Sequence, residues 1–552
     1  MLPVPAVICL AGLFGSFFTW QISRNPWYFW GPAVDAKSYA AVARNVLQGA
    51  GFRWNAIDSF EITTSMRSLD CFTTYYFHPL LIAAVMKMRG DMSQVSALYT
   101  GVICGVLCIP LAYLILRNFF SPYFALFGTF FFCLLPSTLW RGPTGLSEPV
   151  ALLLFFIALS SFSHMRIPAA KGIVLGICLG LMNTTRPTGL VLAPAFLYLA
   201  FHANRFKGVL LFALFFLLPS LAIFFMGSAG ALHYSGVTHF TNMLVGYGAL
   251  DQVDTVSIAP ARRAFQIVPF LHTSYLYLRQ ALFGMSEYLT EDWIFVPVGM
   301  LLIRRKHPEW FVFLLISAVC SFAAVVFYWG VPRYTEHLHI FVVVCILIFL
   351  QETYSRGESK RFLVQIAMGL AMVPLFSVSR LGWEAKTLVG VIITWYFFLS
   401  ASRVSTPKRR NINHSLALSL VLATTVYYLN FHVRCLLNWR QPASPSDFQA
   451  SAAKLIELGV PRNSIIVSDV YRELPWFLGT DCISWPGRPL PLLTRLETTS
   501  RPLYIVLKDP PTDSALAELK QISYSQVFTA LPGITVFSRE GMKSRAVGKP
   551  PG

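Results

Sequence analysis

Long apolar runs separated by short polar segments make up most of the first 430 residues of the chain. A helix of about 20 apolar residues is long enough to cross the hydrocarbon core of a bilayer. The pattern therefore predicts an α-helical polytopic membrane protein with about 13 spans. We expect these spans near residues 3–20, 93–116, 122–139, 146–163, 172–185, 188–203, 208–226, 292–303, 309–328, 337–351, 362–378, 387–402 and 414–432.

Two shorter apolar stretches lie in the long loop 21–92, after the first predicted span. From Val34 onwards, apolar residues recur at helical spacing, with Asp35 at the start and the Gly49-Ala50-Gly51-Phe52 segment at the end. This spacing predicts an amphipathic helix. The stretch from Tyr75 to Met88 is too short to span. We expect the first helix to lie along the membrane surface on its apolar face, and the second to be an interfacial or a re-entrant helix.

The composition becomes that of a soluble domain after about residue 434. Apolar runs at 464–469, 503–508 and 533–538 predict buried strands, and 446–458 and 513–522 predict helices. We expect a membrane domain over residues 1–433, a small α/β domain over 434–540 and a disordered tail over 541–552. The loop 227–291 is long for a connector, which indicates a functional lid.

The overall composition excludes two classes of protein. The chain is 55% hydrophobic and only 13% charged, which is too apolar for a soluble protein of 552 residues. Its net charge of +18 is spread in small clusters between apolar runs. A nucleic-acid site needs one continuous basic face, so we expect no nucleic-acid partner.

The Lys and Arg residues predict the orientation. Fifteen of them lie in one alternate set of short loops and five in the other set. Positive residues favour the cytoplasmic side. We therefore expect a multi-pass plasma-membrane protein with a cytoplasmic N-terminus, and with the loops 21–92 and 227–291 and the C-terminal domain outside.

Several ionisable residues coincide at the predicted outer ends of spans. These are Asp35, Glu148, Arg186 and Arg333. A transporter concentrates such groups near the middle of the bilayer, whereas a site at the span ends is open to lipid and to the outside. The structural alternatives are helix capping for Asp35 and Glu148, and pairing with lipid headgroups for the arginines.

Five short motifs occur in an order that resembles a known family. They are the Asp35 helix ending in Gly-Ala-Gly-Phe52, Tyr76-Phe-His-Pro-Leu80, Leu146-Ser-Glu-Pro149, Gly180-Leu181 followed by Thr185-Arg-Pro187, and Arg333-Tyr334. Together they resemble the GT-C glycosyltransferases, which include the protein O-mannosyltransferases, the aminoarabinose transferases and their bacterial relatives. The resemblance covers about residues 5–350 and implies a GT-C-like fold.

The resemblance also implies an activity: transfer of a sugar, with inversion, from a polyprenyl-phosphate donor to a hydroxyl of a lipid, polysaccharide or protein acceptor. The catalytic acid of the family maps onto Asp35. By position and sign, Arg186 and Arg333 are the candidates that bind the donor phosphate. Many relatives have a second acid next to the first, but Ala36 stands there, so the second acid is either dispensable or replaced by another residue such as Asp58 or Asp70. Further site candidates are Lys37, Tyr39, His78, Glu148, Tyr334 and His337.

Other interpretations stay open at this stage. A divalent metal, for example at Asp251 and Asp254, is less favoured than a metal-free site. A transporter or flippase for a lipid-linked sugar is the main alternative function, because it would need the same outer cations. A third reading is a non-catalytic envelope protein that acts through its C-terminal domain. The Trp-Trp-Asp signature of oligosaccharyltransferases is absent, which disfavours transfer of a whole glycan to asparagine.

Overall fold

The structure is a computed structural model, and two parts of the chain are described. In the first part these are residues 3–24, 34–54, 56–57, 71–73, 75–135, 144–186, 188–227, 231–233, 295–324 and 337–353. In the second part they are residues 463–469, 480–486, 489–497, 501–507, 511–531 and 534–539, with scattered positions from 419 to 499.

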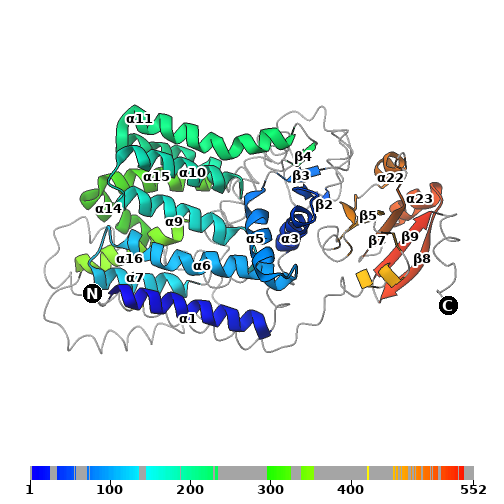
Figure 1. Cartoon of the computed structure of the whole chain (residues 1–552), viewed down its shortest axis with the longest axis horizontal. Helices are drawn as coiled ribbons and strands as arrows, with labels where there is room; N and C mark the ends of the chain where they lie inside the picture. Colours follow the sequence, from blue (N-terminus) through cyan, green and yellow to red (C-terminus); the bar gives the residue numbers. More distant parts are fainter. Residues whose placement is uncertain are drawn as a thin grey trace.

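A bundle of long apolar helices forms the first part (Figure 1). Among the described residues, three helices are long and apolar enough to cross a bilayer, and five more are apolar but shorter. Each predicted span between residues 3 and 351 corresponds to a helix or to half of one. The spans predicted at 362–378, 387–402 and 414–432 lie outside the described residues, apart from positions 419 and 421, so their number stays a prediction. The bundle consists of α1 (Pro3–Arg24), α6 (Gln94–Leu116), α7 (Pro122–Leu134), α9 (Glu148–His164), α10 (Pro168–Asn183), α11 (Thr188–Gly227), α14 (Val296–Lys306), α15 (Pro308–Ala324) and α16 (His339–Thr353).

Helix α11 is two helices joined at a sharp kink. The backbone leaves the helical region at Asn204 and Arg205, and Arg205 has a φ of 45°. The two halves correspond to the separate spans predicted at 188–203 and 208–226.

The second half of α11 packs closely on α10. A Cβ added to Gly176 would lie 2.5 Å from the Phe212 carbonyl oxygen, and Gly172 and Gly180 meet the α11 backbone in the same way. These glycines are spaced four residues apart, so they share one face of α10. Small residues in such a row let two helix backbones approach each other, as is common in membrane helix pairs.

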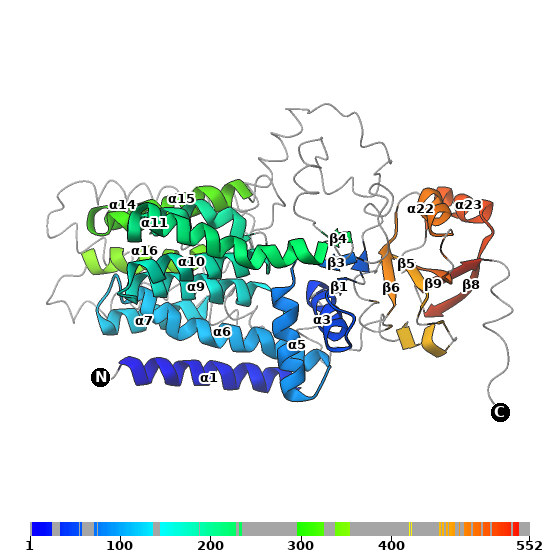
Figure 2. The same ribbon diagram turned by 45° about the horizontal axis from the view of Figure 1, so that its top comes forward.

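Two shorter helices lie across one end of the bundle, as Figures 1 and 2 both show. They are α3 (Val34–Leu47) and α5 (Phe77–Arg89), which correspond to the two predicted amphipathic helices. Helix α5 ends at Gly90 in the left-handed region, where the Gly90 amide donates to the Lys87 and Met86 carbonyls. The N-terminus lies at the opposite end of the bundle.

A six-stranded mixed sheet forms the second part, beyond α3 (Figure 2). The predicted strands are present as β5 (Ile465–Ser468), β7 (Leu503–Leu507) and β9 (Ile534–Arg539), and the predicted helix 513–522 is α23 (Asp513–Gln521). The pattern analysis missed β6 (Asp481–Ser484), β8 (Tyr524–Leu531) and the short helix α22 (Leu490–Leu496). The boundary of a separate domain at residue 434 stays a prediction.

One edge strand of this sheet comes from the segment between α3 and α5. Strand β2 (Ala56–Ile57) pairs in parallel with β6, so the sheet order is β2-β6-β5-β7-β9-β8. Directly before β2 in the chain, β1 (Arg53–Trp54) pairs with β3 (Cys71–Thr73). Strand β3 in turn pairs with β4 (Ala231–His233), which ties the segment between α3 and α5 to the residues that follow α11.

Candidate active site

Four segments far apart in the sequence bring polar residues to the end of the bundle that α3 and α5 cover (Figure 1). Asp35 lies in the first turn of α3, and Glu148 is the first residue of α9. Arg186 lies two residues before the start of α11, and His78 lies in the first turn of α5. Asp35, Glu148 and Arg186, three of the four residues expected on one outer surface, thus lie at the same end of the bundle, and the side of the membrane stays a prediction.

Glu148 and Arg186 form a buried ion pair. The Arg186 Nη1 atom lies 2.8 Å from the Glu148 Oε1 atom, and the two side chains are only 7% and 3% exposed, respectively. A buried charge without a partner is very costly, so each side chain makes the burial of the other tolerable. Glu148 is thus more than a helix-capping residue, because it holds the guanidinium that sequence analysis selected for the donor phosphate.

His78 is fully buried and hydrogen-bonded to the loop before α9. Its Nε2 atom lies 3.0 Å from the Gly145 carbonyl oxygen. Burial lowers the pKa of His78 to about 4, so the ring is neutral at physiological pH. A neutral ring can contact a carbonyl oxygen only through a protonated nitrogen, so Nε2–H is the donor.

Gly145 positions this loop against α3. Its φ is 68°, a conformation that L side chains rarely adopt. A Cβ at this position would also lie 3.5 Å from the Ala36 Cβ atom and from the Ala97 carbonyl oxygen. The loop therefore lies directly against the residue that follows Asp35.

Tyr39 connects these groups. Its ring meets the His78 ring edge-on, with the ring centroids 5.0 Å apart. Partial burial, and next the charge of Asp35, raise the pKa of Tyr39, while the charge of Arg186 opposes the shift. The phenol is therefore neutral and lies within electrostatic reach of Asp35, Glu148 and Arg186. We name these five residues, Asp35, Tyr39, His78, Glu148 and Arg186, the polar cluster.

Two further predicted site residues, His337 and Lys37, are buried. The His337 Nε2 atom is 2.9 Å from the Ser321 hydroxyl, which donates its own proton to the Ser317 carbonyl. His337 also lies within reach of the charge of Arg186. Lys37 is only 1% exposed, which is rare for a lysine, and its role in the site stays a prediction.

Four predicted site residues lie outside the described part of the chain: Asp58, Asp70, Arg333 and Tyr334. Within the described part, no three His, Cys, Asp or Glu side chains gather as metal ligands. The sequence analysis missed Gly145 and Ser321 as partners of the two histidines. Gly145 could have been found, because it directly precedes the Leu146-Ser-Glu-Pro149 motif.

No protein-family model and no curated protein matches the sequence. A solved structure does match over almost the whole length. It is ArnT from Cupriavidus metallidurans bound to undecaprenyl phosphate, with a TM-score of 0.51 and 13% sequence identity over 99% of each chain. The chain has a GT-C fold. The family resemblance of its motifs is thus confirmed at the level of the fold.

The GT-C fold also accounts for the apolar bundle, and the chain is a membrane protein. A second match is the archaeal oligosaccharyltransferase AglB from Archaeoglobus fulgidus in complex with an inhibitory peptide and a dolichol-phosphate. That match has a TM-score of 0.48 and 13% identity, and it covers 98% of this chain and 74% of AglB. The similarity to AglB is too low to support any argument about this chain.

Proposed function

We propose that the protein is an inverting membrane glycosyltransferase that moves a sugar from a polyprenyl-phosphate donor to a hydroxyl of an envelope acceptor. The observation that carries this proposal is the polar cluster, where a carboxylate on α3 and a guanidinium shortly before α11 both lie within electrostatic reach of Tyr39. The match to ArnT supports the choice of donor, since that protein binds undecaprenyl phosphate.

Asp35 is the proposed general base. The acceptor hydroxyl oxygen attacks the anomeric carbon of the donor sugar, and its proton passes to the Asp35 carboxylate. The bond between the anomeric carbon and the phosphate oxygen breaks on the opposite side, so the configuration inverts. Asp35 is half-buried at a helix start, where an outer acceptor can approach it.

Arg186 is the proposed partner of the leaving lipid phosphate. The phosphate departs with the bonding electrons, and a nearby cation stabilises the negative charge that develops on it. Glu148 holds the guanidinium in place. Arg333, outside the described residues, is the second proposed cation. We place the site and the C-terminal domain on the outer face of the plasma membrane.

The experiment begins by comparing envelope lipids and glycans, with and without the gene, by mass spectrometry. The missing sugar defines the donor and acceptor for a transfer assay with purified protein in lipid nanodiscs. Asp35→Asn is expected to lower kcat by a factor of about 10²–10⁴. The control is Asp513→Asn, the same change at an exposed residue of α23, which is expected to keep full activity.

Full transfer by a normally expressed Asp35→Asn protein would overturn the role of Asp35. A purified protein that moves the lipid-linked sugar across the bilayer and makes no glycosylated product would overturn the proposed function in favour of a flippase.

A further inference from the structure

Helix α3, which carries Asp35, is packed between the membrane bundle and the C-terminal sheet. Its small residues Ala36, Ala40 and Ala43 are buried against α1, α5 and α6. Val42, by contrast, is fully buried in the core of the C-terminal domain, beside β5, β6 and β7. The C-terminal domain thus packs against one face of the helix that carries Asp35.

Tyr39 belongs to both packing clusters. It lies against the C-terminal core around Val42 and also against the membrane-side cluster. The same side chain contacts His78 in the polar cluster. Tyr39 is therefore a direct packing link between the C-terminal core and the polar cluster.

The segment between α3 and α5 adds a backbone connection. Ala56 and Ile57 of β2 pair in register with Cys482 and Ile483 of β6. This short strand begins nine residues after the last residue of α3, so the chain that leaves α3 is paired with the C-terminal sheet.

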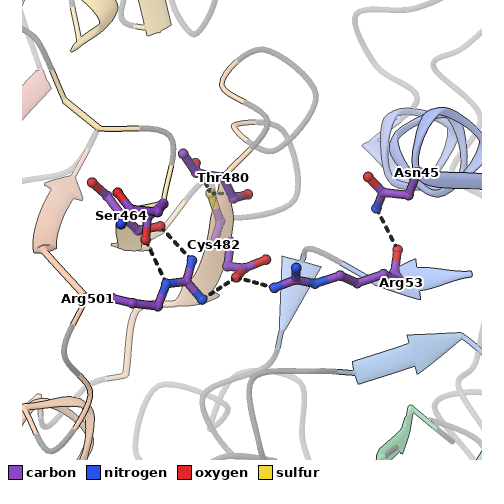
Figure 3. Close-up of polar contacts among 8 residues, drawn as sticks. Asn45, Arg53, Ser464, Thr480, Cys482 and Arg501 are labelled. Carbon is purple, nitrogen blue, oxygen red and sulfur yellow. Dashed lines mark hydrogen bonds and ion pairs between the residues drawn. The ribbon is translucent and has the colours of Figure 1, made fainter. Parts of the chain in front are cut away.

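An ion-pair cluster lies at this connection (Figure 3). The Asp481 Oδ2 atom is 2.7 Å from the Arg53 Nη2 atom and 2.6 Å from the Arg501 Nη1 atom. The Asp481 side chain is only 2% exposed. The Asn45 amide, from the last turn of α3, donates to the Arg53 carbonyl at 2.9 Å. A buried carboxylate of the C-terminal domain is thus linked through Arg53 to the helix that carries Asp35.

We propose that the C-terminal domain holds the Asp35 helix in its working position, and that Asp481 and Arg53 are the positioning residues. Neither residue belongs to the polar cluster. They act through α3, so their loss lets Asp35 move relative to Arg186. The catalytic consequence rests on the proposed function, whereas the mechanical link between domain and helix does not.

Hydrogen exchange of the full chain in lipid nanodiscs tests the mechanical link. In Asp481→Asn and in Arg53→Gln, the α3 amides are expected to exchange about tenfold faster, while the α6 amides do not change. Arg53→Gln leaves the Arg501–Asp481 pair in place, so it probes the link separately from the internal packing of the sheet. Asp513→Asn is the matched control. Unchanged α3 exchange overturns the proposal, whether or not strand β7 keeps its protection.

Transfer kinetics test the positioning role. Both variants are expected to lower kcat by roughly 10–100-fold, with the donor KM almost unchanged, because the donor is bound by the bundle. Arg53→Lys keeps the charge and is expected to restore most of kcat. A normal kcat together with faster α3 exchange would overturn the positioning role. A wild-type protein that makes no product would refute the proposed function and leave the exchange result valid.

Discussion

Arg186 and Glu148 meet at 2.8 Å where α11 and α9 begin, and almost no solvent reaches either side chain. An ion pair thus links the starts of two helices of the bundle, beside the proposed site of the donor phosphate. A lipid phosphate would meet a guanidinium that already has a carboxylate partner. The pair therefore contributes both to the stability of the helix ends and to the orientation of Arg186.

The first prediction concerns the strength of this pair. Glu148→Gln and Arg186→Gln are each expected to destabilise the protein by about 3–5 kcal/mol, because each leaves a buried charge without its partner. The double variant is expected to be less destabilised than the sum of the two. Thermal unfolding of the four proteins in detergent gives the coupling energy. The exposed Lys306–Glu352 pair is the control, and its coupling is expected to be below about 1 kcal/mol. Equal coupling in both pairs would contradict the prediction.

The second prediction concerns pH. Burial holds the pKa of His78 near 4 in the folded protein, below its usual value of 6.5. The unfolded chain therefore takes up a proton first as the pH falls, so stability is complete above about pH 6.5 and is lost progressively towards pH 4. The loss is on the order of 3 kcal/mol. His78→Gln keeps a donor for the Gly145 carbonyl and does not titrate. As the pH is lowered from 7 to 4, the melting temperature of the wild type should fall more steeply than that of this variant.

The third prediction separates the ring of Tyr39 from its hydroxyl. Tyr39→Phe keeps the edge-on contact with His78 and the packing on Val42, so its stability is expected to change by less than about 1 kcal/mol. Tyr39→Ala leaves a cavity between the two packing clusters and is expected to cost about 3 kcal/mol. If the hydroxyl takes part in the site, Tyr39→Phe lowers kcat while the melting temperature stays the same. Normal activity of this variant would limit Tyr39 to packing.

The fourth prediction concerns the contact between α10 and α11. Gly176→Ala places a methyl group 2.5 Å from the Phe212 carbonyl oxygen, so the helices are forced apart. We expect a loss of about 1–3 kcal/mol, measured by thermal unfolding. Gly12→Ala is the matched control, because a Cβ there has no neighbour within 4 Å. That variant is expected to be neutral or slightly stabilised, since alanine favours a helix more than glycine does.

Local patterns in the sequence were sufficient to predict most helices. Apolar length alone located α6, α9 and α16, and helical spacing located α3 after the first span. These elements follow from burial of apolar side chains and from backbone hydrogen bonds within one segment, and both are encoded by neighbouring residues. Strand β6 was missed because it is only four residues long and carries Asp481 and Ser484 at its ends.

The candidate site was only partly predictable. The motifs selected Asp35, His78, Glu148 and Arg186 one by one, but no spacing along the chain indicates that Glu148 pairs with Arg186. The chain has several acids at predicted outer ends and loops, and only the packing of α9 against its neighbours selects one of them.

The sequence by itself determined that this is a helical membrane protein, and that an acid stands at the start of an amphipathic helix. Only the tertiary structure decided what surrounds that helix. The β2–β6 pairing and the contacts of Asp481 with Arg53 join segments more than 400 residues apart. Contacts of this kind depend on complementary shape and charge between distant surfaces, which leave no periodic signal along the chain. The physical reason is that helices satisfy their own backbone groups, whereas an edge strand and a buried carboxylate need partners from elsewhere.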